Sequence, residues 1–136
     1  MPNAPSTQEI LVYVMVATSA ADGQMSDSEL KSIGIHVQTL PVFEGFSDDA
    51  FMDAVRASTG VLDADDGLDS IIRMVADLPI RLQETAYALA VDVAASDLAV
   101  APEEVRLLQL MRDELKLDRL ASAAIERAAK ARHQTA

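Results

Sequence analysis

Two short segments of this chain carry aspartate and glutamate at the same spacing, a pattern that can coordinate a divalent cation. The first contains Asp22 and Glu29, the second contains Asp97 and Glu104, and one constant offset aligns both pairs without a gap. Carboxylate oxygens are ligands that hard divalent cations prefer. If the two segments fold as related helix–turn–helix units, these four side chains can converge on one ion.

A fifth carboxylate, Asp92, lies in an apolar stretch between Val91 and Val93. A charge in such surroundings needs a partner, which is either a cation or an arginine such as Arg106 or Arg112. The sequence therefore predicts no cofactor beyond a divalent cation, with Ca²⁺, Mg²⁺, Mn²⁺ and Zn²⁺ all open. The candidate metal ligands are Asp22, Glu29, Asp92, Asp97 and Glu104.

Two other interpretations of the acidic turns stay open at this point. Segment 22–29 matches part of an EF-hand calcium loop, including the glycine and the last glutamate, but Thr18 and Ala20 occupy the first and third ligand positions. That loss of charge disfavours an orthodox EF-hand. Alternatively, Glu29 only completes a capping box with Ser26, and the acids serve as helix caps and solvated side chains.

The sequence lacks the motifs of several common catalytic sites. The chain has no cysteine and contains no glycine-rich phosphate loop or Gly-x-Ser-x-Gly segment. Its two histidines, His36 and His133, are too far apart in the sequence to suggest a zinc motif. We therefore expect a protein that is not an enzyme, with a metal-dependent hydrolase as a minor alternative.

The negative charge of the chain limits the classes of molecule that it can bind. The net charge is −11, and residues 1–102 hold sixteen acidic but only four basic side chains. Such a surface repels phosphate backbones and anionic lipids, so we expect neither nucleic-acid binding nor membrane insertion. We expect protein partners, and the acidic turns form a candidate site for either a divalent cation or a basic partner surface. The eight-residue apolar run from Ile10 to Ala17 is too short to cross a bilayer. The absence of cysteine is compatible with a cytoplasmic location.

Helix-forming residues dominate, and the sequence predicts an all-α bundle with one domain over residues 1–136. Its repeat units are 9–37 and 84–112, two helix–acidic turn–helix units expected to be related by a pseudo-twofold axis. Serines before acidic first turns, together with proline and glycine positions, mark the helix boundaries. The expected helices cover about 7–20, 27–38, 48–58, 68–78, 80–95, 102–115 and 119–131.

Two of these helices carry further expectations. In the helix that starts at Pro102, apolar spacing predicts that Val105, Leu108 and Met111 face the core. In the last helix, an apolar face between Leu120 and Ala131 would allow a homodimer, although the same alanines can pack inside a monomer.

The paired turns resemble those of the tellurite-resistance TerB-like family, in which an alanine-rich helix leads into Ala/Ser-Asp-Gly, a short turn and a helix-opening glutamate. Ala21-Asp22-Gly23 with Glu29 fits that pattern, and Ser96-Asp97 with Glu104 fits it with Leu98 in place of the glycine. The resemblance covers about residues 8–118. It implies a helical bundle with an acidic metal-binding cluster, a role in tellurite resistance and stress response, and other tellurite-resistance proteins as partners.

Overall fold

The computed structural model describes residues 4–21, 25–96 and 101–136. These residues form seven α-helices and no strand, which confirms the predicted all-α class. A single 3-10 turn, η1 (Pro41–Phe43), joins the second helix to the third. The helices are α1 (Thr7–Ser19), α2 (Asp27–Thr39), α3 (Asp48–Leu62), α4 (Gly67–Ala76), α5 (Ile80–Ala95), α6 (Pro102–Glu114) and α7 (Arg119–Arg132).

Side-chain caps fix four of the seven helix starts where the sequence predicts them. The side chains of Ser6, Ser26, Ser47 and Asp118 each accept a hydrogen bond from the backbone N–H three residues later. These bonds satisfy donors that the first turn of a helix leaves without an intrahelical partner. At α6 the start is set by Pro102 at the first helical position, where its missing N–H has no cost.

Two helix ends differ from the predicted ones. Helix α3 continues to Leu62 through Gly60, a residue that weakens a helix without stopping it. Helix α4 ends at Ala76, short of Leu78, and the side chain of buried Gln83 donates to the carbonyl oxygens of Ala76 and Leu78 at 3.1 and 2.9 Å. These bonds satisfy carbonyl groups that a longer α4 would have paired internally.

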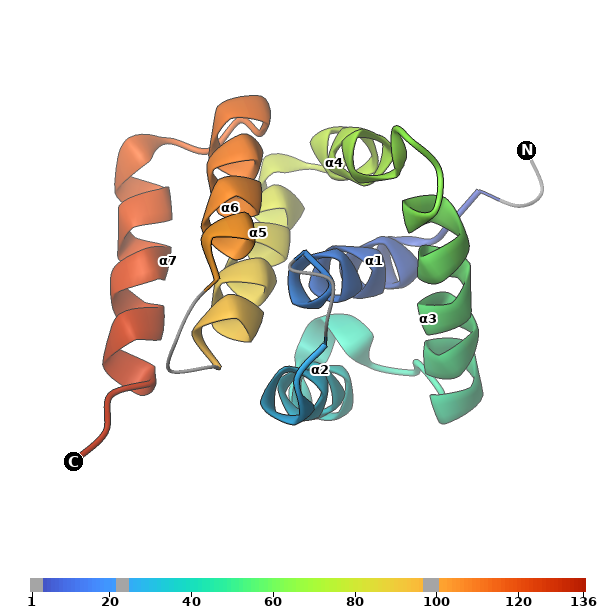
Figure 1. Cartoon of the computed structure of the whole chain (residues 1–136), viewed down its shortest axis with the longest axis horizontal. Helices are drawn as coiled ribbons and strands as arrows, with labels where there is room; N and C mark the ends of the chain where they lie inside the picture. Colours follow the sequence, from blue (N-terminus) through green and yellow to red (C-terminus); the bar gives the residue numbers. More distant parts are fainter. Residues whose placement is uncertain (1–3, 22–24, 97–100) are drawn as a thin grey trace.

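Helix α1 is the centre of the core. Every residue from Ile10 to Ser19 is buried, and α1 packs against α3, α4 and α5. Figure 1 shows α1 in the middle of the molecule, with α3 on one side, α5 and α6 on the other, α4 above and α2 below. Because neighbouring helices surround α1 on all sides, α1 is apolar all round, and its apolar residues form an unbroken run in the sequence. No helix in the described ranges has both the length and the apolarity needed to cross a membrane.

The predicted register of α6 is wrong at one position. Val105 is 44 % exposed, whereas Leu107 is buried together with Met111, and Leu108 is half-buried. Glu104, three residues before Leu107, is buried on the same side of the helix. The buried face of α6 thus begins with the carboxylate of Glu104. A pattern of apolar residues alone does not predict a buried glutamate.

Helix α7 lies at the edge of the molecule and packs mainly on α5 (Figure 1). Only Ser122 and Ala129 of this helix are buried, and Leu120 is 84 % exposed. Only a small part of α7 is therefore buried.

Candidate functional site

Glu29 is a buried carboxylate at the third position of α2, with only 2 % of its surface exposed. Its Oε1 accepts hydrogen bonds from the backbone N–H and the hydroxyl of Ser26, both at 3.1 Å. Its Oε2 is also buried and has no hydrogen-bond partner among the described residues. A buried carboxylate oxygen without a donor costs free energy, so this atom is suited to a ligand that the protein itself does not supply.

Glu104 has the same place in α6 as Glu29 has in α2. It is also 2 % exposed, and its Oε1 accepts the backbone N–H of Ala101 at 3.1 Å. Ala101 has no side-chain oxygen to complete a capping box. The second copy of the pattern therefore keeps the buried glutamate although the serine that accompanies it in the first copy is absent.

A third glutamate shows what capping alone requires. Glu9 accepts the backbone N–H of Ser6 at 2.9 Å in the same geometry at the start of α1. The bond is at the exposed surface, and Glu9 is only half-buried. Capping in this chain thus works without deep burial, and the burial of Glu29 and Glu104 calls for another explanation.

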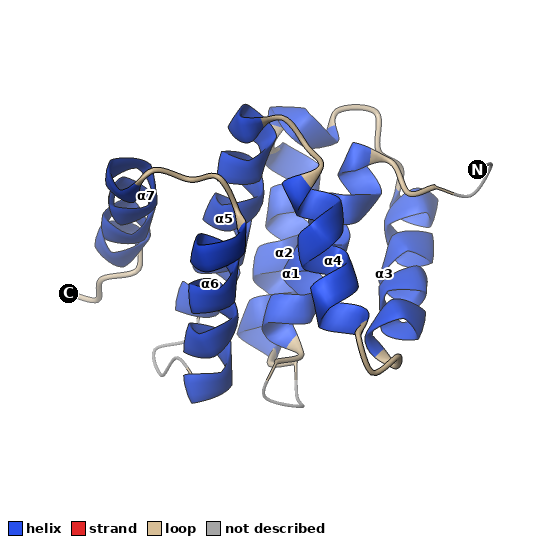
Figure 2. Cartoon of the chain, turned by 90° about the horizontal axis from the view of Figure 1, so that it is seen from above, coloured by secondary structure: helices blue, strands red, loops and turns tan. Residues whose placement is uncertain are grey.

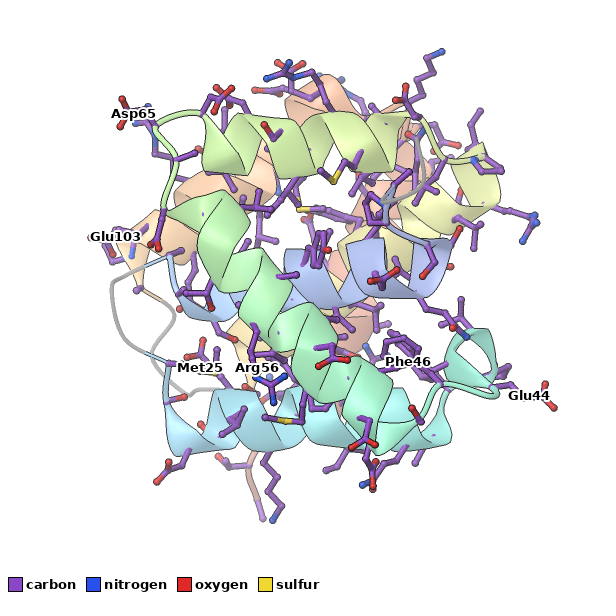
Figure 3. The ribbon with its side chains drawn as sticks, turned by 90° about the vertical axis from the view of Figure 1, so that its right-hand side faces the viewer. Met25, Glu44, Phe46, Arg56, Asp65 and Glu103 are labelled. Atoms are coloured by element: carbon purple, nitrogen blue, oxygen red, sulfur yellow. The ribbon has the colours of Figure 1, made fainter. Side chains whose placement is uncertain are left out.

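The two aspartates of the predicted site, Asp22 and Asp97, lie outside the described residues, but the helix ends beside them share one edge of the molecule. Figure 2 shows the N-terminal ends of α2 and α6 both toward its lower edge. In Figure 3, Met25 at the start of α2 and Glu103 at the start of α6 lie along the same side of the view. The structure therefore places Glu29 and Glu104 at one end of the bundle.

Two hollows connect the repeat units at this edge in a reciprocal way. A pocket of about 350 Å³ is lined by Ala20 and Ala21, which precede Asp22, and by Glu103, which precedes Glu104. A larger groove is lined by Ser28, which precedes Glu29, and by Ser96, which precedes Asp97. The end of the first helix in each unit thus lies near the start of the second helix in the other.

Asp92 has a different set of neighbours from the one the sequence suggests. Its side chain is 16 % exposed and accepts a hydrogen bond from Arg132 at 2.5 Å, so neither Arg106 nor Arg112 is its partner. The Nε2 atoms of His36 and His133 each lie 3.6 Å from one of its carboxylate oxygens. Asp92 therefore joins α5 to α2 and to the C-terminal end of α7, and its negative charge is already compensated.

Sequence reasoning missed this cluster because His36 lies on α2, Asp92 on α5 and His133 directly after α7. Burial is the main cause that lowers the pKa of His36, and the positive charge of Arg132 and the nearby His133 act in the same direction. Asp92 opposes them. The apolar surroundings of Asp92 were the only signal in the sequence, and they indicated the need for a partner without identifying it.

Arg112 of α6 belongs to a second network, which joins α5, α6 and α7. It donates to Glu126 Oε2 at 2.8 Å and to the hydroxyl oxygen of Tyr87 at 3.2 Å, and that hydroxyl donates to the same Glu126 oxygen. Burial and the Glu126 carboxylate raise the pKa of Tyr87 to about 12. Together with Arg132, this network attaches α7 to α5 at two points.

The groove beside Asp92 has a volume of about 790 Å³. It runs along facing stripes of α2 and α5 and reaches the C-terminal end of α7. Its apolar lining comes from Ile35, Leu40, Ala88 and Leu89, and its charged lining from Lys31, Asp92 and Arg132 together with the two histidines.

The described residues contain no group of three or more histidine, cysteine, aspartate or glutamate side chains arranged to hold a metal ion. Any cation site at the acidic edge would therefore need Asp22 or Asp97 in addition to the buried glutamates. No family model matches the chain, and neither the curated proteins nor the solved structures contain a significant match.

Proposed function

We propose that this chain is a TerB-like stress-response binding module that uses its two acidic turns to hold one divalent cation. The observation that carries the proposal is the burial of Glu29 and Glu104, both 2 % exposed, where capping alone leaves Glu9 half-buried. Glu29 adds a buried oxygen that has no hydrogen-bond partner among the described residues. Positive charge at this end of the bundle would stabilise two buried carboxylates, and a divalent cation supplies it.

The remaining ligands in this proposal are Asp22 and Asp97. Each precedes the buried glutamate of its own turn, and the flanking residues line hollows shared between the two units. Ca²⁺ takes six to eight oxygen ligands and tolerates irregular geometry, so four carboxylates with backbone carbonyls or water suit it best. Asp92 is left out of the ligand set because Arg132 already pairs with it.

In this proposal the cation stabilises the acidic edge for contact with a basic surface of a protein partner in the cytoplasm. The acidic body of the chain, with a net charge of −11, supports such a partner over nucleic acid. Binding of this kind needs no catalytic group.

One observation favours a second candidate function, a structural domain without a ligand. Ser26 and Glu29 form a complete capping box, so the first glutamate already has a structural role without any metal. In that case the acids only cap helices and keep the protein soluble.

Calorimetric titration of metal-free protein with Ca²⁺, Mg²⁺, Mn²⁺ and Zn²⁺ separates the two candidates. We expect one ion per chain, and we expect Glu29→Gln and Glu104→Gln each to weaken binding about tenfold or more, because each removes a carboxylate ligand. Glu9→Gln is the matched control, since it changes the glutamate that caps α1. The affinity of this variant for the cation should equal that of the wild type. If none of the four ions binds saturably, the structural domain is favoured.

A further inference from the structure

The groove between α2 and α5 has the dimensions of a small-molecule site. Its volume of about 790 Å³ lies within the usual range for ligand pockets, roughly 300–1,000 Å³. The lining residues of α5 extend from Thr85 to Ser96, which corresponds to about 17 Å along the helix axis at about 1.5 Å per residue. A medium-length alkyl chain matches this length.

The apolar part of the lining is partly open to solvent. Ile35 is 49 % exposed although it is a large hydrophobic residue, and it shares the groove with Leu40 and Leu89. Ala88 on the floor of the groove has a small side chain, which leaves room above the helix. An alkyl chain placed here would remove apolar surface from water, which is favourable in proportion to the buried area.

The charged part of the lining contrasts with the rest of the protein. Lys31 on α2 and Arg132 on α7 face the same hollow, whereas residues 1–102 contain only four basic side chains in all. Asp92 orients Arg132 through one of the five N–H donors of the guanidinium group. His36 and His133 add two further nitrogen-bearing rings around Asp92. Because Asp92 offsets one of the two basic groups, Lys31, Arg132 and Asp92 leave one net positive charge in the lining, which is complementary to an anionic ligand group.

The size of the lining favours a small ligand over a protein helix. Fourteen residues line the groove, whereas a stable protein interface uses about 20–30 residues on each side. An apolar wall with charged donors gathered about Asp92 fits a molecule that is itself apolar with one charged group.

We propose that this groove binds an amphiphilic carboxylate of the fatty-acid class, with the alkyl chain over Ala88 and Leu89 and the carboxylate between Lys31 and Arg132. The proposal does not depend on cation binding at the acidic edge. It adds a ligand class to the module, and it gives the cluster around Asp92 a role in positioning Arg132.

Titration of the full-length protein with dodecanoate, and in parallel with dodecan-1-ol, tests this proposal. Both probes are used below the concentration at which they aggregate, and binding is followed by calorimetry and by amide chemical shifts. We expect one dodecanoate per chain, with the alcohol about tenfold weaker because it lacks the charge that Lys31 and Arg132 recognise. The shifts should concentrate on α2, α5 and the end of α7.

Three variants sharpen the test. Lys31→Gln, at an exposed position of α2, should bring the affinity for dodecanoate close to that for the alcohol without a change in fold, and Ala88→Phe should block both probes by filling the groove. Ala57→Phe on the exposed side of α3 is the matched control and should bind as the wild type does. Equal affinity for acid and alcohol, no binding of either, unaltered binding by Ala88→Phe, or preference for an acidic helical peptide would overturn the proposal.

Discussion

At the scale of single residues, the buried polar side chains distinguish this bundle from a plain helical core. Glu29, Glu104 and Gln83 are each 2 % exposed, and Tyr87 is completely buried. Gln83 connects three segments, since it also accepts the backbone N–H of Lys116 at 2.9 Å. Such groups cost free energy unless they are paired, so each one indicates a specific structural or binding requirement.

Tyr87 allows a prediction about pH and stability. Its folded-state pKa of about 12 lies above the ordinary value of 10.0, so the unfolded chain loses the phenolic proton first as the pH rises. Stability from this group is fully present below pH 10 and is lost between pH 10 and about 12. Between pH 10 and about 12, the free energy of unfolding of Tyr87→Phe should therefore fall by about 2–3 kcal/mol less than that of the wild type. Denaturant unfolding at a series of pH values measures this difference.

At neutral pH, Tyr87→Phe should lower the free energy of unfolding by about 1–2 kcal/mol, because it removes a hydrogen bond to the charged Glu126. Tyr13→Phe is the control at neutral pH, since the Tyr13 hydroxyl makes no hydrogen bond to the described residues. This variant should lower the free energy of unfolding by less than Tyr87→Phe does. Parallel stability curves for wild type and Tyr87→Phe between pH 10 and 12 would contradict the account of this network.

At the scale of the elements, helix boundaries were the most predictable feature and helix faces the least. Ser26 and Ser47 cap helices where local sequence predicts them, because a cap depends only on residues three or four positions apart. Val105 was assigned to the core by its apolar character, yet the buried position belongs to Glu104. Which face of a helix is buried depends on neighbouring helices, and those are set by the tertiary structure.

The junction between α3 and α4 allows a second prediction. A Cβ atom on Gly67 would lie 2.2 Å from the carbonyl oxygen of Val61 and 2.8 Å from the Cα atom of Leu62. Both are backbone atoms that cannot move aside cheaply, so Gly67→Ala should lower the free energy of unfolding by about 1–3 kcal/mol. Denaturant unfolding with circular dichroism measures this change.

Gly34→Ala is the matched control for that substitution. Gly34 lies inside α2, and a Cβ atom there meets nothing within 4 Å. Alanine is the better helix former by about 0.5–1 kcal/mol, so this variant should stabilise the protein. If both variants shifted stability by the same amount in the same direction, the close packing at the junction would be refuted.

At the scale of the whole molecule, the matched spacing of the two acidic turns is visible in the sequence, but their relative position in space is not. Glu29 and Glu104 could be aligned by one offset, whereas the sharing of one edge by their helices required the packing of α1, α2, α5 and α6 (Figures 2 and 3). His36 and His133 give the opposite lesson. Their separation in the sequence argued against a common site, yet both lie beside Asp92 because α2 and α7 flank α5.

The central claim, one cation shared by two acidic turns, is tested most directly by paramagnetic broadening. Mn²⁺ is added to isotope-labelled protein well below one equivalent, and the amide signals of the two turns are compared. We predict that the signals around Glu29 and Glu104 broaden together at the same Mn²⁺ concentration, and that Asp22→Asn or Asp97→Asn weakens both effects. Broadening confined to one turn, or spread evenly over the acidic surface, would contradict a shared site.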